Sequence, residues 1–282
     1  MVLYYDIFRH PLTIAELSRL VGAPADAAVD DLVAAGAVDR EGNYVCRPGQ
    51  RSHVEGRKAR AREAERLWVD AQVAAAALAR FPYVRGVMVT GGLSKQSAQA
   101  GGDVDFLLLI EPGWVWTTKS SLQMLRRTLP ERTRNLFCTN YLLDTDHLLV
   151  DDRNRFTAME LATAVPLYGP ERCTAFLEAN AWAEAYIPGY RWNVERARHA
   201  RSLHSASWAE RIIRPLRALA EGPSMRVWSG FWDRKYHWLP EATRRQRFKR
   251  RPEIATNHLH DFQDYVLREY QERCVAAGVD PE

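Results

Sequence analysis

Apolar and polar positions along the chain predict a small sheet set between helical regions. Residues 84–110 contain two apolar strand-like runs separated by glycines and a short polar segment, and residues 135–143 alternate as a third strand. Apolar residues recur with helical spacing over 51–80 and 115–129. We therefore expect an α+β chain with a small mixed β-sheet over residues 81–150.

The first part of the chain, residues 1–50, predicts three short helices followed by a β-hairpin. Helices are expected at 4–8, 13–21 and 24–35, and the second begins with the capping box Thr13-Ile-Ala-Glu16. The hairpin follows with a glycine-containing turn. This order of elements resembles bacterial winged-helix domains.

The third helix of this region argues against direct DNA binding. It carries Asp26, Asp30 and Asp31 but no arginine or lysine, whereas a recognition helix needs cations and amides for phosphates and base edges. We expect contact with another protein, or a lid, as the role of the winged helix.

A long helix over residues 51–80 is predicted to connect the winged helix to the sheet. One face of this helix is expected to be buried as an apolar stripe. The predicted stripe consists of Trp68, Val69, Gln72, Val73 and Ala76.

The rest of the chain, residues 151–282, predicts a helical C-terminal domain. Proline and glycine separate its helices, which are expected at 157–164, 171–181 and 194–220. Thr157 is expected to cap the first of them, with Glu160 completing a capping box. A later aromatic group is expected to be core: Trp228, Phe231, Trp232, Tyr236 and Trp238.

The composition is that of an ordinary globular protein, with 46% hydrophobic and 26% charged residues among 282. No apolar run approaches the roughly 20 residues of a membrane helix. The N-terminus lacks the basic and apolar regions of a signal peptide. We therefore expect a cytoplasmic protein with no membrane partner.

The net charge of +4 is unevenly distributed. Residues 244–251, RRQRFKRR, hold six cations with almost no compensating acids, which suits nucleic acid, nucleotide phosphates or an acidic surface. The cysteines are scattered without CxxC spacing and predict neither a zinc site nor a disulfide framework. His258 and His260 lie on different faces of a helical pattern and indicate no metal site.

The segment between the first two strands carries the candidate chemistry. Asp103 and Asp105 open the second strand, where residues two apart point to the same face. Paired carboxylates need a cation, and Mg²⁺ takes one or two carboxylates together with substrate phosphates. Upstream, Gly91 and Gly92 allow the backbone N–H groups to approach a phosphate. This combination indicates nucleotide chemistry.

Gly91-Gly92, followed by Gly102-Asp103-Val104-Asp105, resembles the signature of the DNA polymerase beta-like nucleotidyltransferase superfamily. That signature is Gly-Ser, a spacer, and Asp-x-Asp at the edge of a small mixed sheet. The resemblance implies that Asp103 and Asp105 are catalytic residues that bind Mg²⁺ or Mn²⁺. It also implies that Gly91 and Gly92 contact the nucleoside triphosphate.

The chain departs from this signature at two positions in the turn. Gly92 stands where the family has serine, and Gln96 stands where it often has glycine. Ser94 and Lys95 are close enough in sequence to supply a hydroxyl and a positive charge to the nucleotide.

Family members usually carry a third carboxylate on a later strand. The alternation of residues 135–143 places Cys138, Asn140 and Asp144 on one face, and Asn140 best matches the third position. An amide can ligate a metal but supplies no charge. Either Asn140 is a catalytic residue and weak ligand, or Asp144 or Asp146 replaces it, or the site is impaired.

The resemblance implies transfer of a nucleoside monophosphate from an NTP to an acceptor hydroxyl or amine, with release of pyrophosphate. A small molecule or a protein is the expected acceptor, since no RNA-binding module is recognisable. A catalytically impaired protein that senses nucleotide is the alternative, supported by Gly92, Gln96 and Asn140. A third hypothesis is that the protein is a DNA-binding transcription factor, but the acidic third helix argues against it.

Overall fold

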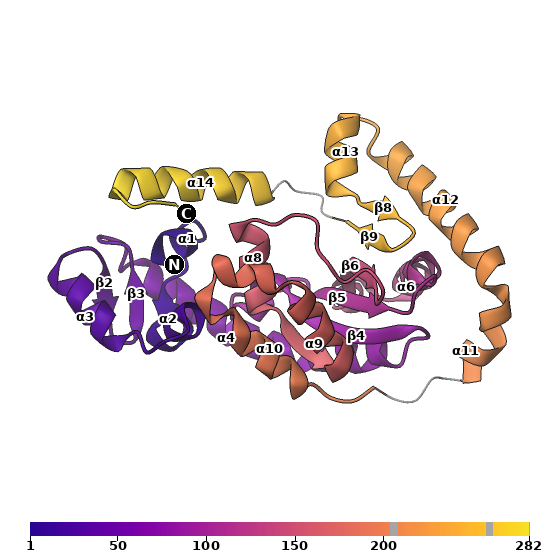
Figure 1. The fold of residues 1–282 in the computed structure, drawn as a ribbon, viewed down its shortest axis with the longest axis horizontal. Helices are drawn as coiled ribbons and strands as arrows, with labels where there is room; N and C mark the ends of the chain where they lie inside the picture. The colour runs from indigo at the N-terminus through magenta and orange to yellow at the C-terminus, as the bar shows by residue number, and fades with distance from the viewer. Residues whose placement is uncertain (204–207, 258–261, 282) are drawn as a thin grey trace.

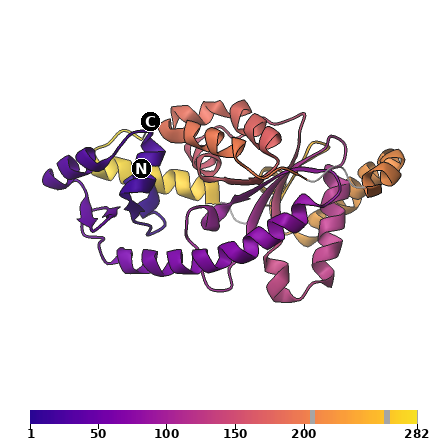
Figure 2. The ribbon, with the colours of Figure 1, turned by 90° about the horizontal axis from the view of Figure 1, so that it is seen from below.

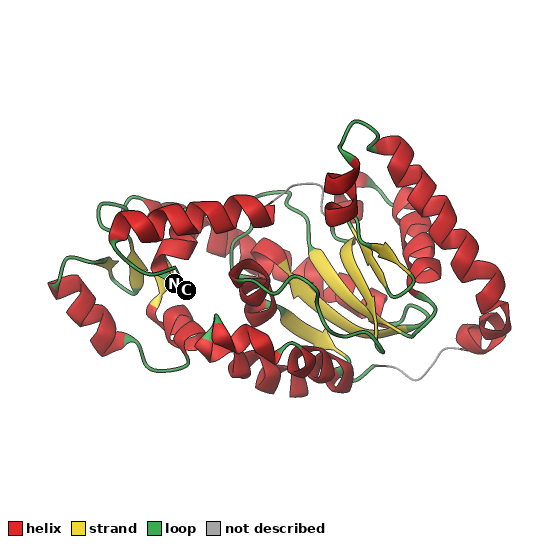
Figure 3. Cartoon of the chain, turned by 45° about the horizontal axis from the view of Figure 1, so that its top comes forward, coloured by secondary structure: helices red, strands yellow, loops and turns green. Residues whose placement is uncertain are grey.

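The computed structural model describes residues 1–203, 208–257 and 262–281. It is an α+β fold with two small sheets, as the sequence predicts at this level. Figure 3 shows the short strands of the first sheet set apart from the larger group of strands in the second. His258 and His260 lie outside the described residues.

The N-terminal region forms the three helices and the hairpin expected for it. Helices and strands follow in the order α1 (Val2–Asp6), β1 (Leu12–Thr13), α2 (Ile14–Val21), α3 (Asp26–Ala34), β2 (Asp39–Glu41) and β3 (Tyr44–Cys46). The strands are antiparallel in the order β1-β3-β2. The capping box is confirmed, because Thr13 Oγ1 accepts the Glu16 N–H and the Glu16 carboxylate accepts the Thr13 N–H.

The second sheet has six strands in the order β7-β4-β5-β6-β9-β8. Its strands are β4 (Val84–Thr90), β5 (Asp105–Ile110), β6 (Cys138–Asp144), β7 (Val165–Tyr168), β8 (Arg250–Arg251) and β9 (Ile254–Thr256). Only β5 and β6 pair in parallel; the other neighbours are antiparallel. Since β7, β8 and β9 come from residues 151–282, the expectation of a purely helical C-terminal domain is wrong. Distant segments complete the sheet on both sides of the predicted strands.

Helices cover both faces of this sheet. The helices after the N-terminal region are α4 (His53–Ala79), α5 (Gly91–Ser94), α6 (Val115–Thr128), α7 (Glu131–Asn135), α8 (Arg155–Thr163), α9 (Pro170–Ala179), α10 (Arg191–Arg198), α11 (Trp208–Ile213), α12 (Arg217–Lys235), α13 (Glu241–Arg247) and α14 (Phe262–Ala277). Short 3₁₀ helices lie at η1 (Ala181–Ala185), η2 (Pro188–Tyr190) and η3 (Arg214–Leu216). Figure 2 shows the sheet between α4 and α6 on one side and α9 and α10 on the other.

The buried face of α4 differs from the predicted stripe. Val69 and Val73 are 65% and 68% exposed, whereas Ala64, Ala71 and Ala75 are fully buried. Alanine has little bulk, so these positions let the helix axis approach the sheet closely, and Leu78 is buried beside them. Of the predicted stripe, Trp68, Gln72 and Ala76 are not fully buried either.

The last helix, α14, returns to the N-terminal region (Figure 1). Arg273 pairs with Asp6 at 3.1 Å, and the rings of Tyr270 and Tyr4 pack edge-on with centroids 5.9 Å apart. The two ends of the chain therefore stabilise each other. Among the described residues, no helix is both long and apolar enough to cross a membrane.

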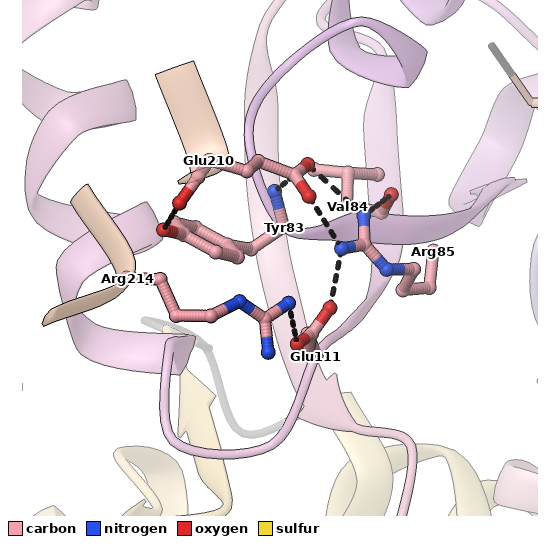
Figure 4. Close-up of polar contacts among 6 residues, drawn as sticks. All are labelled: Tyr83, Val84, Arg85, Glu111, Glu210 and Arg214. Atoms are coloured by element: carbon pink, nitrogen blue, oxygen red, sulfur yellow. Dashed lines mark hydrogen bonds and ion pairs between the residues drawn. The ribbon is translucent and has the colours of Figure 1, made fainter. Parts of the chain in front are cut away.

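Helices α11 and α12 form an arm that is tied to the sheet by buried carboxylates. Glu210 accepts the backbone N–H of Tyr83 at 2.8 Å and pairs with Arg85 at 2.7 Å. Figure 4 shows the chain of ion pairs continuing from Arg85 through Glu111 to Arg214. Further along the arm, Glu221 accepts backbone N–H groups at the start of α6 and caps that helix.

The basic segment 244–251 has more acidic partners than its sequence suggests. Arg245, Lys249, Arg250 and Arg251 all make ion pairs. Their partners are Glu241, Asp151, Asp152, Asp233 and Glu253. The prediction of an almost uncompensated cationic cluster is therefore wrong, because both neighbouring acids and the distant Asp151 and Asp152 converge on it. In the aromatic group, Trp228, Trp232 and Tyr236 are buried as expected, whereas Phe231 and Trp238 are exposed.

Candidate functional site

The site is built on the turn between β4 and β5. Gly91 begins this turn with a φ of +68°, a conformation that glycine adopts without steric cost. A Cβ on Gly91 would lie 2.4 Å from Asp105 Oδ2, since Asp105 pairs with Thr90 on the neighbouring strand. The absence of a side chain at Gly91 therefore lets the Asp105 carboxylate rest against the turn.

The tight turn gives the departure at Gly92 a local cause, whereas nothing in the structure explains glutamine at position 96. A Cβ on Gly92 would lie 2.5 Å from the carbonyl oxygen of Ser97, so serine cannot occupy this position without a shift of the backbone. The turn is this tight because the Gly92 carbonyl accepts both Lys95 N–H and Ser97 N–H. Gln96 has a φ of +57°, so it adopts the left-handed conformation that favours glycine.

Ser94 and Lys95 hold the turn together. Ser94 Oγ donates to the Gly91 carbonyl at 2.9 Å, and Lys95 Nζ donates to the same oxygen at 3.1 Å. Lys95 also pairs with Glu160 of α8 at 2.9 Å. The positive charge of Lys95, which the sequence predicts to contact the nucleotide, is thus already paired with the carboxylate of Glu160, far away in the sequence.

Glu160 is a residue whose role the sequence misassigned. The cap of α8 is Asn154, whose Oδ1 accepts the Thr157 N–H at 3.0 Å, so Thr157 is not the cap and Glu160 completes no capping box. Glu160 instead faces the turn, where it raises the pKa of Asp105. In the sequence, Glu160 is only an acidic residue on a predicted helix. Such residues are too common for the sequence to predict its contact with the turn.

Asp103, Asp105 and Cys138 form a cluster that could hold a metal ion. Their ligand atoms all lie within 4.8 Å of one another, and Asp105 is paired with Cys138 across the parallel strands β5 and β6. Asp103 is exposed just before β5, while Asp105 and Cys138 are half-buried. Sequence alternation placed Cys138 near this face but did not identify it as part of the cluster.

The electrostatics of the cluster favour a bound cation. Burial, followed by the nearby carboxylates of Asp103 and Glu160, raises the pKa of Asp105 to about 7 against the opposing effect of Lys95. Burial likewise raises the pKa of the Cys138 thiol to about 12, with Asp105 contributing. A divalent cation would offset this repulsion, and two carboxylate ligands suit Mg²⁺ or Mn²⁺.

Asn140 lies at the cluster because of a β-bulge in β6. The register of β5 and β6 shifts after Phe106, which pairs with Thr139, so that Leu107 pairs with Tyr141. Asn140 Nδ2 donates to Asp105 Oδ1, and Cys138 Sγ donates to Asn140 Oδ1 at 3.1 Å. The amide nitrogen therefore faces the carboxylate, so this geometry makes Asn140 a partner of Asp105 rather than an oxygen ligand.

The predicted substitutes for Asn140 lie too far from the cluster. Asp144 pairs with Ile110 at the opposite end of the strands, roughly 16 Å along β5 from Asp105. Its carboxylate accepts the backbone N–H groups of Asp146 and His147 and thereby closes the turn after β6. Neither Asp144 nor Asp146 completes the metal cluster, because both lie at or beyond the opposite end of β6 from Asp105.

A cleft of about 290 Å³ adjoins the turn. Ser94, Lys95 and Gln96 line one side, and the other sides come from the N-terminal region, α4, α8, β7 and α10. Arg57 of α4 stabilises this junction, since it donates to the Gln96 carbonyl at 3.0 Å and pairs with Glu16 at 2.7 Å.

Comparison with known proteins gives no independent assignment. No family model, no curated protein and no solved structure matches this chain. The features that bear on function are the carboxylate cluster, the glycine turn and the cleft next to that turn.

Proposed function

We propose that this chain is a metal-dependent nucleotidyltransferase of the DNA polymerase beta-like type. It transfers a nucleoside monophosphate from an NTP to a hydroxyl or amine of a small molecule or protein and releases pyrophosphate. The observation that carries this proposal is the position of Asp103 and Asp105 beside the Gly91 turn, on a small mixed sheet.

Asp103 and Asp105 would hold Mg²⁺ or Mn²⁺ through their carboxylate oxygens. When bound, the ion supplies positive charge that neutralises the triphosphate and lowers the pKa of an attacking hydroxyl. Asn140 keeps the Asp105 carboxylate oriented by its amide hydrogen bond. Gly91 and Gly92 leave the backbone of the turn open to a phosphate, and Ser94 and Lys95 keep that turn in shape.

The N-terminal region supports a role in contacts rather than in reading DNA. Its element order and its strand order, β1-β3-β2, are those of a winged helix. The charged residues of the third helix are all acidic, and one of them, Asp30, pairs with Arg40 of the hairpin. Nucleic acid is further disfavoured as acceptor because most cations of the basic segment are paired with carboxylates.

The proposal is tested by pyrophosphate release from each of the four NTPs, with Mg²⁺ or Mn²⁺ and a broad acceptor panel. We expect the Asp103→Ala and Asp105→Ala variants to lose turnover while retaining the circular dichroism spectrum of the wild type. Asp146→Ala, at the far end of the strands, is the matched control and should remain active. Undiminished turnover in the double variant Asp103→Ala/Asp105→Ala would exclude the proposed site.

A nucleotide-sensing protein is the second candidate, and Asn140 is the observation that favours it. The position that usually carries a third carboxylate here carries an amide whose nitrogen faces Asp105. Calorimetry with ATP and GTP, with and without Mg²⁺, separates the two functions. Metal-dependent binding without pyrophosphate release across the acceptor panel would favour the sensor.

A further inference from the structure

The cleft beside the turn contains two arginines that have no acidic partner among the described residues. Arg19 comes from the last turn of α2 and Arg196 from the last turn of α10, and both line the cleft. Each guanidinium lies 5.2 Å from the ring centroid of Trp192. The tryptophan thus holds two like charges near each other at the cleft wall.

The nearest acids are already engaged. Glu16, which also lines the cleft, pairs with Arg57 at 2.7 Å. Lys95, the other cation of the cleft wall, pairs with Glu160. Burial lowers the pKa of Arg196, and the charge of Arg19 lowers it further, which shows the mutual repulsion of the two groups. Since an arginine stays charged at physiological pH, an anion is the partner that relieves this repulsion.

A buried histidine also lines the cleft. His10 is only 4% exposed and lines the cleft, and its Nε2 atom has no hydrogen-bond partner among the described residues. Burial and the surrounding cations Arg57, Arg60 and Lys95 hold the pKa of His10 well below its ordinary value, so its ring is neutral. His10 therefore adds an uncharged ring, and no further positive charge, to the wall of the cleft.

We propose that this cleft binds a phosphorylated small molecule, with its phosphate between Arg19 and Arg196 and its organic part reaching towards His10. Two guanidinium groups match the charge of a phosphate monoester, about −2 at neutral pH, better than the single charge of a carboxylate. A cleft of about 290 Å³ accommodates a ligand the size of a sugar phosphate or mononucleotide.

The place of this ligand in the reaction follows from the shared wall of the cleft. Ser94 and Lys95 belong both to the cleft and to the turn that carries Gly91. A phosphorylated molecule in the cleft would lie next to this turn and is therefore assigned as the acceptor. This assignment as acceptor rests on the proposed transferase function, whereas binding of the phosphorylated molecule does not.

Calorimetry of the full chain with ribose 5-phosphate, inorganic phosphate, ribose and acetate tests the proposal. EDTA is present throughout, so that the result is independent of the metal cluster and of any transfer activity. We expect ribose 5-phosphate and inorganic phosphate to bind, and ribose and acetate to bind at least about tenfold more weakly. Arg19→Gln and Arg196→Gln should each weaken ribose 5-phosphate binding by about tenfold or more.

The matched control is Arg198→Gln, which removes the same charge from α10 at an exposed position paired with Glu195. It should bind ribose 5-phosphate as the wild type does, and thermal melting of all variants checks that they fold. Absence of phosphate binding up to about 10 mM overturns the proposal. Equal affinities across the variants, or acetate binding as tightly as phosphate, overturn it too. Turnover is measured in a separate assay. The absence of transferase activity would therefore leave the test of phosphate binding unaffected.

Discussion

At the scale of single residues, the site depends on which groups can lie next to Asp105. Gly91 has no side chain and leaves space for the Asp105 carboxylate. Asn140 donates a hydrogen bond to the same carboxylate. The sequence pattern identified Asp103 and Asp105, which lie close together although β5 begins only at Asp105. It could not identify Glu160, because the contact between α8 and the turn depends on tertiary packing.

Gly91→Ala should displace Asp105, because the added Cβ would lie 2.4 Å from Oδ2. We expect Mn²⁺ affinity, measured by electron paramagnetic resonance, to fall by at least about tenfold. Gly101→Ala is the control, since Gly101 also has a positive φ, +71°, but a Cβ there would meet no atom within 4 Å. Equal Mn²⁺ affinities in the two variants would show that the carboxylate does not depend on the space at Gly91.

Asp105 also makes the stability of the metal-free protein depend on pH. Burial raises its pKa from 3.8 to about 7, so the folded state holds this proton more tightly than the unfolded chain. The contribution of Asp105 to stability is therefore complete below about pH 4 and is lost as pH rises through about 7.

Asp105→Asn stays neutral and should be more stable than the wild type at about pH 8, by on the order of 2 kcal/mol, with a smaller difference at about pH 5. Urea denaturation in EDTA at the two pH values measures this difference. Asp146→Asn, at the exposed turn after β6, should show no such change with pH. A difference that is independent of pH would contradict the raised pKa.

At the scale of elements, the helix α4 and the strand β6 differ most from their sequence patterns. The apolar residues of α4 suggested a valine and tryptophan stripe, but alanines form the buried face because they allow close approach to the sheet. In β6, alternation predicted one face for Cys138, Asn140 and Asp144, but the bulge breaks that alternation and Asp144 lies at the far end of the strand. Both patterns correctly gave the type of element, and neither gave the packing.

Ala71→Leu should destabilise the fold, because Ala71 is fully buried between α4 and its neighbours. We expect a loss of about 1 to 3 kcal/mol in the free energy of unfolding, measured by urea denaturation. Ala77→Leu changes an exposed position of the same helix and should alter stability by less than about 0.5 kcal/mol. Similar losses in both variants would mean that helix propensity, and not packing, causes the effect.

At the scale of the whole molecule, distant segments join the N-terminal region to the sheet. Helix α14 packs against α1 through Arg273 and Asp6, and Arg57 links α2 to the turn of the site. Arg57 is only 2% exposed, so its charge depends on Glu16 for compensation. This arrangement makes the N-terminal region a wall of the cleft rather than a separate attachment.

Arg57→Met should leave Glu16 without its cation and destabilise the junction. We expect a loss of about 3 kcal/mol, together with faster hydrogen exchange in α2 and in residues 94–97. Glu16→Gln retains a side chain that can complete the capping box with Thr13. Combining it with Arg57→Met should therefore restore part of the lost stability. Additive losses in this double-mutant cycle would show that the pair does not act as a unit.

The sequence by itself determined the structural features that depend only on residues close together in the chain. The capping box of Thr13 and Glu16, the apolar cores of β4 and β5, and the adjacency of Asp103 and Asp105 all follow from local spacing and local hydrogen bonds. These features need no partner from elsewhere in the chain, so a pattern of a few residues specifies them.

Tertiary structure decided what depends on partners that are far away in the sequence. The addition of β7, β8 and β9 to the sheet, the pairing of the basic segment, and the contacts of Lys95 with Glu160 and Asn140 with Asp105 all join distant segments. The cleft with Arg19 and Arg196 is also formed only when α2 and α10 meet. Local periodicity in the sequence does not predict contacts between distant segments, because burial and charge compensation are properties of the packed chain.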